Sequence, residues 1–158
     1  MPELHRPPVA RAEMTIRRPA EDVFEAFVDP SVTTNFWFTS SSGRLEAGKT
    51  VRWEWEMYGA GDDVTVLAVE PNRRIRIACA SDGTETEWTF TPRSADATHV
   101  VIEHSGFRGD GDDVVGQAID AMGGYTMTLC GAKAYLEHGI RLNLVADKSP
   151  DRHANPQE

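Results

Sequence analysis

"DDVVGQAIDAMGGYTMTLCGAKAYLEH", residues 112–138, decides the architecture because it contains no proline and repeats apolar residues at helical spacing. A helix over this range is on the order of 40 Å long. Asp112 and Asp113 suit its first turn, where carboxylates accept from free N–H groups and favour the positive end of the dipole. The expected apolar stripe consists of Val115, Ile119, Met122, Tyr125, Leu129, Ala132 and Leu136. Such a helix is expected to cover the apolar face of a sheet.

The residues before this helix predict that sheet. Residues 10–17 alternate between apolar and charged side chains, as a half-buried strand does. A short helix follows Pro19 and ends at Asp29-Pro30, and "SVTTNFWF" forms a second helical turn at best. Six further segments between turn residues are expected to be strands: residues 41–48, 50–63, 64–72, 73–83, 84–96 and 98–107. About seven strands, mostly consecutive, predict an antiparallel meander in an α+β domain.

The domain limits follow from composition. Residues 9–144 carry the periodic segments and form one expected domain. Residues 1–8 and 145–158 are rich in proline and charge and poor in side chains that pack, so flexible tails are expected there.

Charge and cysteine content narrow the class of function. With 25 acidic and 16 basic residues the chain carries a net charge of −9, which disfavours nucleic acid and anionic membrane surfaces as partners. No apolar run reaches the length of a signal peptide or a membrane span, so we expect a cytoplasmic protein without membrane insertion. Cys79 and Cys130 lie far apart and outside any zinc-ligand spacing, so no disulfide and no metal site are expected.

Several motifs carry a resemblance to a known family. They are "IRRPAEDVFEAFVDP…NFWF" from Ile16, "VTVLAVEPNRRIRI" from Val64, and "THVVIEHSGF…GGYTMTLCGAKAYLEHG" from Thr98. These stretches resemble the activator of 90-kDa heat-shock protein ATPase homologue family, within the START-like (SRPBCC, helix-grip) superfamily that includes polyketide cyclases. The resemblance implies a curved antiparallel sheet wrapped around the C-terminal helix. One departure is Gly124-Tyr125, where such families often have Gly-Trp.

A sheet curved around a single helix leaves its widest gap at the centre of the curve. Strand alternation directs large aromatic side chains toward this gap, whereas the middle of the helix carries Gly123 and Gly124. Each glycine costs the helix roughly 1 kcal/mol relative to alanine. Close approach, a kink or spare room would each explain them, and all three explanations stay open.

The candidate ligand-binding residues follow from this geometry. They are Trp37, Trp53, Trp55, Trp88, Phe90, His104, Met122, Tyr125 and Leu129. We expect Trp37 at one mouth of the space, and the alternative is that the aromatic residues simply fill the core. His104 and Tyr125 are the polar pair expected inside, where they either orient a ligand or hydrogen-bond within the core.

Three functions compete. The first is noncovalent binding of a small hydrophobic or aromatic molecule in a cavity between sheet and helix, with no cofactor. The second, implied by the resemblance, is a co-chaperone-like interaction with a protein partner. The third is a polyketide cyclase-like enzyme with His104 and Tyr125 as acid and base, although no nucleophile set accompanies them and no catalytic residue is assigned. Either a monomer or a homodimer is compatible with the sequence.

Overall fold

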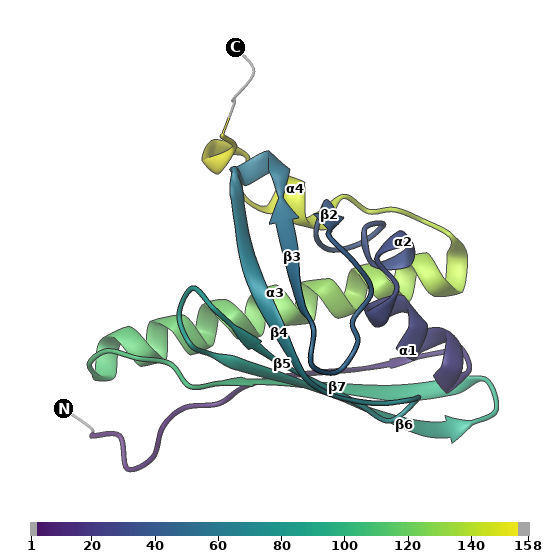
Figure 1. Ribbon diagram of the computed structural model, residues 1–158, viewed down its shortest axis with the longest axis horizontal. Coiled ribbons are helices and arrows are strands. Elements are labelled where there is room, and N and C mark those ends of the chain that lie inside the picture. Colours follow the sequence, from purple (N-terminus) through teal and green to yellow (C-terminus); the bar gives the residue numbers. More distant parts are fainter. Residues whose placement is uncertain (1–2, 155–158) are drawn as a thin grey trace.

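The computed structural model describes residues 3–154, and the remainder of both expected tails lies outside this range. One seven-stranded sheet has the order β1-β7-β6-β5-β4-β3-β2 (Figure 1). Its strands are β1 (Ala10–Ile16), β2 (Ser40–Ser41), β3 (Thr50–Trp55), β4 (Ala60–Glu70), β5 (Arg74–Cys79), β6 (Glu85–Ser94) and β7 (Ala97–Ser105). The helices are α1 (Ala20–Val28), α2 (Pro30–Thr33), α3 (Gly111–His138) and α4 (Leu144–Lys148), with 3₁₀ turns η1 (Glu56–Tyr58) and η2 (Pro150–Arg152). The α+β helix-grip prediction is confirmed.

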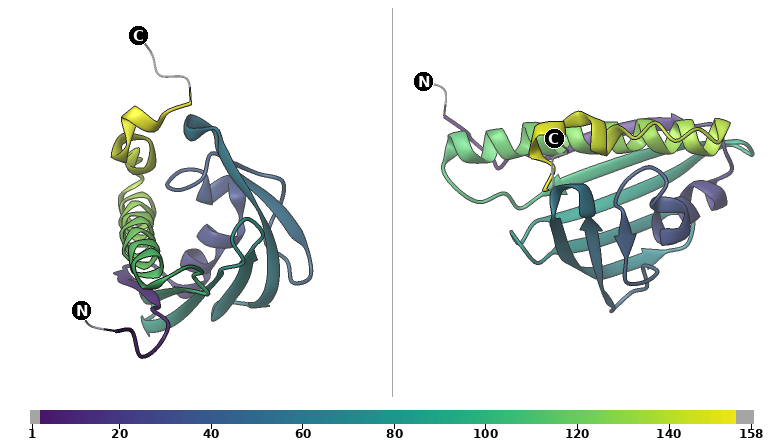
Figure 2. Two further views of the ribbon diagram at one scale, coloured as in Figure 1. Left: turned by 90° about the vertical axis from the view of Figure 1, so that its left-hand side faces the viewer. Right: turned by 90° about the horizontal axis from the view of Figure 1, so that it is seen from above.

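Strands β2 to β7 form an antiparallel meander, and the last strand, β7, also pairs with the first strand, β1. Strand β4 contains an irregularity between Val66 and Ala68, and such irregularities increase the bend of a strand. Figure 2 shows the result: the sheet curls around one side of α3, with β1 close to the helix and β3 and β4 rising away from it.

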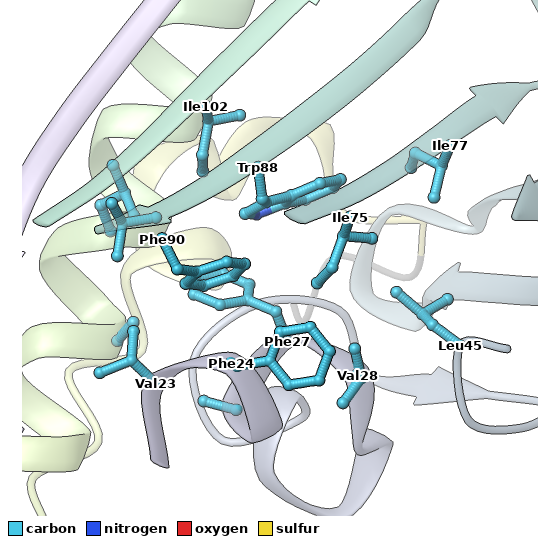
Figure 3. Close-up of a cluster of buried hydrophobic side chains, with 14 of the residues drawn as sticks. Val23, Phe24, Phe27, Val28, Leu45, Ile75, Ile77, Trp88, Phe90 and Ile102 are labelled. Atoms are coloured by element: carbon cyan, nitrogen blue, oxygen red, sulfur yellow. The ribbon is translucent and has the colours of Figure 1, made fainter. Parts of the chain in front are cut away.

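One end of the interior is filled by aromatic side chains (Figure 3). Phe24 and Phe27 of α1 pack on Phe90 of β6, with ring centroids 5.5 and 6.1 Å apart, and Phe27 also contacts Trp88 at 6.1 Å. Trp88 is 1% exposed, and Trp37 and Tyr125 also pack against it, with ring centroids 6.0 and 6.3 Å away. Asp29 lies between α1 and α2 and has an extended backbone conformation. Its side chain caps α2 by accepting from the Ser31 N–H, and the chain then continues toward Trp37.

Helix α3 begins with a capping box, in which the side chains of Asp110 and Asp113 each accept from the other residue's N–H. The cap is therefore Asp110, two residues before Asp112, and Asp112 and Asp113 lie in the first turn. The helix ends at Gly139, whose φ of +67° lies in the left-handed region that glycine adopts without strain.

The two halves of α3 have different surroundings. In the second half Leu129 and Ala132 are 0% exposed, whereas in the first half Ile119 is 69% and Met122 is 53% exposed. The prediction that one apolar stripe faces the sheet along the whole helix is wrong for Val115, Ile119 and Met122. The reason is length: α3 packs mainly on β1, and a helix of 28 residues spans about 42 Å whereas a strand of 7 spans about 23 Å.

The segment after α3 turns back along the helix and reaches the β3–β4 connection (Figure 2). Tyr58 in η1 donates from its hydroxyl to the Val145 carbonyl, and its ring meets His153 edge-on at 5.4 Å. The Ala154 N–H donates to the Met57 carbonyl at 2.8 Å. Residues that the composition predicts to be a tail thus bridge α3 and the sheet.

Candidate functional site

A cleft of about 580 Å³ lies between the middle of α3 and the outer strands of the sheet. The helix lines it with Asp120, Ala121, Gly124, Tyr125, Met127 and Thr128. The sheet side contributes Trp37, Trp55, Tyr58 and Ala60. The segment after α3 contributes Val145, Lys148, Ser149 and Arg152. The cleft therefore has walls from three parts of the chain.

The aromatic wall of the cleft is formed by Trp37 and Trp55, and Trp37 lies at its centre. Its ring lies 4.9 Å from Trp53, 6.1 Å from Trp55 and 5.8 Å from Tyr125, all in edge-to-face arrangements that aromatic quadrupoles favour. Trp53 is 3% exposed and stacks on Phe38 at 4.9 Å, so it supports the wall from behind. The indoles of Trp37 and Trp55 are thus held in place by buried rings, and this gives the cleft a rigid apolar surface.

The glycines of α3 show why the cleft exists. A Cβ added at Gly123 or Gly124 meets no atom within 4 Å, and Gly124 lies on the cleft lining. A Cβ at Gly131 would instead lie 3.3 Å from the Cβ and the carbonyl oxygen of Phe36. Close approach, a kink and spare room are the three explanations for the glycines of α3. Spare room fits Gly123 and Gly124, where an added Cβ meets no atom, whereas close approach explains Gly131.

A buried polar network lies behind the phenol of Tyr125. Thr86 Oγ1 is 2.5 Å from His104 Nδ1 and 3.1 Å from the Tyr125 hydroxyl, which is itself 3.4 Å from His104 Nδ1. Burial lowers the pKa of His104, and the charge of Asp82 opposes this only in part. Burial also raises the pKa of Tyr125 above its ordinary value of 10.0. The three side chains thus form one buried hydrogen-bonded network that fixes the Tyr125 phenol against the sheet.

The thiol nearest this network is not activated. Burial raises the pKa of Cys79 from 9.0 to about 11, so the protonated thiol dominates at neutral pH. The nucleophilic form is the thiolate, and a low pKa is the mark of a reactive cysteine. We therefore assign Cys79 a structural role.

The structure distributes the nine predicted ligand-binding residues over four environments. Trp37, Trp55 and Tyr125 line the cleft. Four others are buried in the core: Trp53, Trp88, Phe90 and Leu129. His104 is 8% exposed and lies behind Tyr125, and Met122 is on the exposed side of α3.

Sequence reasoning missed two groups of residues. Thr86 shares strand parity with Trp88 and Phe90, so the alternation of β6 could have identified it. No comparable signal identifies Tyr58, Lys148 and Arg152. The segment after α3 is held in place by hydrogen bonds to backbone carbonyls, and any residue type supplies such a carbonyl.

Residues 3–154 contain no group of three or more His, Cys, Asp or Glu side chains that could hold a metal ion. Within the same range, none of the helices has the length and apolar character needed to cross a membrane.

Comparison with known families gives the identity of the fold. The profile of the family described as "Activator of Hsp90 ATPase homolog 1-like protein" matches residues 17–137. The chain belongs to this family. The match spans the elements from α1 to the end of α3 and therefore includes most of the cleft walls.

Several solved structures share the fold of this chain. Protein SSP2350 from Staphylococcus saprophyticus is 34% identical, with a TM-score of 0.76, covering 85% of this chain and 96% of that one. The Aha1 dimer from Colwellia psychrerythraea is 20% identical, with a TM-score of 0.72 and coverage of 84% and 98%. The di-domain ARO/CYC protein BexL from the BE-7585A biosynthetic pathway is 14% identical, with a TM-score of 0.73 and coverage of 82% and 46%. A comparison with curated proteins gives no significant match.

Proposed function

We propose that this protein binds a small hydrophobic or aromatic molecule noncovalently in the cleft between α3 and the outer strands. The observation that carries the proposal is the 580 Å³ volume beside two fixed indoles, within the range typical of small-molecule sites. Family membership and fold are both compatible with a ligand-binding domain of the helix-grip type.

The chemistry of the walls favours a ligand with flat apolar parts. Trp37 and Trp55 offer ring surfaces for stacking and edge contacts. On the opposite wall Ala121, Gly124 and Thr128 are small and leave space for a ligand. The Tyr125 ring lines the cleft, while its hydroxyl is in hydrogen-bond contact with Thr86 in the buried network behind it.

Two glycine substitutions test this proposal. Gly124→Leu places a side chain on the cleft lining, whereas Gly123→Leu adds the same side chain to an adjacent position outside it. Both remove a helix-weakening glycine, so neither is expected to unfold the protein. The probe is the neutral dye N-phenylnaphthylamine, followed by its own fluorescence and by quenching of tryptophan emission.

We expect the dye to bind wild type and Gly123→Leu equally and to lose about tenfold or more affinity in Gly124→Leu, because leucine occupies part of the space. Equal binding by all three proteins contradicts the proposed site. Failure of the wild type to bind any apolar aromatic probe contradicts the proposed function.

A second candidate function, protein interaction, is favoured by the exposed apolar face of α3 formed by Val115, Ile119 and Met122. We propose a second copy of the chain as its occupant, because the relative from Colwellia psychrerythraea is a dimer in solution. Light scattering across a concentration series tests this proposal. We expect a dimer that Ile119→Glu converts to a monomer, and a wild-type monomer at every concentration contradicts it.

A further inference from the structure

The open rim of the cleft has a charge opposite to that of the molecule. The chain carries a net charge of −9, yet the cleft lining includes the cations Lys148 and Arg152 and one carboxylate, Asp120. Lys148 comes from the end of α4 and Arg152 from η2, so the segment bridging α3 and the sheet supplies both cations. Each is exposed, as a charged rim around an apolar interior should be.

Both rim cations are available to a ligand. Among residues 3–154, no carboxylate forms an ion pair with Lys148 or Arg152, whereas Arg44, Arg74 and Arg76 are each paired with a glutamate. Asp147 and Asp151 are chain neighbours of these cations, but neither contributes to the lining or pairs with them. Asp120 is the only lining carboxylate in the described part of the chain, and it would repel an anion.

The inner end of the cleft cannot take a charge. Trp37, Trp55 and the ring of Tyr125 surround it, and the same burial that raises the pKa of Tyr125 disfavours any anion there. A bound molecule must therefore place apolar atoms inward and any anionic group outward, where water still reaches it.

We propose that the ligand of this cleft is an amphipathic anion, with an apolar ring body against Trp37 and Trp55 and a carboxylate, sulfonate or phosphate group between Lys148 and Arg152. This inference rests on the proposed binding function and specifies its ligand class. The cations supply both direct charge-assisted hydrogen bonds and a local field that offsets the repulsion from the acidic surface.

A matched pair of dyes separates the two claims. Anilinonaphthalene sulfonate and N-phenylnaphthylamine have the same ring body, and only the first carries a sulfonate. The ratio of their affinities therefore reports the headgroup contribution. The test variant is Lys148→Gln with Arg152→Gln, and the control is Arg17→Gln with Arg93→Gln, which removes the same charge at exposed positions outside the cleft.

We expect the affinity ratio to fall about tenfold in the test variant and to change less than twofold in the control, while binding of the neutral dye stays the same in both. Asp120→Asn should raise the ratio, and salt should lower it in wild type. If the neutral dye binds at the cleft but the test and control variants give equal ratios, the headgroup proposal is overturned and the binding function stands. If neither dye binds, both are overturned.

Discussion

The two halves of α3 differ although they belong to one continuous helix. In the second half Leu129 and Ala132 are fully buried, and Gly131 allows Phe36 to approach closely. The half around Ile119 and Met122 is exposed, and its Gly123 and Gly124 face open space. The difference teaches that burial of the second half provides stability, while the cleft wall lies at the middle of the helix, where the buried surface ends.

The strongest test of this comparison is truncation of one large side chain in each half. Leu129→Ala removes a side chain with 0% exposure and should lower the free energy of unfolding by about 2–5 kcal/mol through lost burial and a cavity. Met122→Ala, at 53% exposure, should change it by less than about 0.5 kcal/mol. Urea denaturation measures both values, and similar losses at the two positions would show that the halves are not distinct.

A smaller effect is expected at the glycines. Gly123→Ala should raise the free energy of unfolding by about 0.5–1 kcal/mol, because helix propensity improves and no atom is displaced. Gly131→Ala should gain less or lose stability, since its Cβ would lie 3.3 Å from Phe36. Thermal and urea unfolding of the pair give the difference, and an equal gain at both positions would remove the evidence for close packing at Gly131.

The smallest effect is a pH dependence at the boundary between the halves. His104 has a lowered pKa when folded, so below its ordinary value of 6.5 the unfolded chain takes up a proton that the folded chain does not. Stability is therefore lost as pH falls from about 6.5 toward the folded pKa. Unfolding measured between about pH 7 and about pH 5 should show a shallower loss in His104→Gln than in wild type, and identical slopes would contradict a buried, neutral His104.

Much of the fold could be predicted from periodicity. The alternation in residues 10–17 and the uninterrupted pattern in residues 112–138 gave β1 and α3 nearly to their ends. Local patterns identify which face of an element is apolar, but they do not show how far the opposing element extends. For that reason the apolar pattern predicts that Met122 faces inward, although β1 packs against the second half of α3.

The candidate site was harder to predict than the fold. Strand parity directed Trp53, Trp55 and Trp88 inward, but parity cannot distinguish a ring on a cleft wall from one in the core. The rim cations Lys148 and Arg152 lie in a segment rich in proline and charge, held by bonds to the backbone that leave no mark in the sequence.

The central claim is that an apolar molecule binds between the middle of α3 and the aromatic wall formed by Trp37 and Trp55. Its most direct test is an amide and indole NMR titration of the protein with N-phenylnaphthylamine. Binding in the cleft predicts saturable shifts at the Trp37 and Trp55 indoles and the Gly124 amide, with the Ala132 amide unchanged. Shifts confined to Ile119 and Met122, or no saturable shift at all, would contradict the claim.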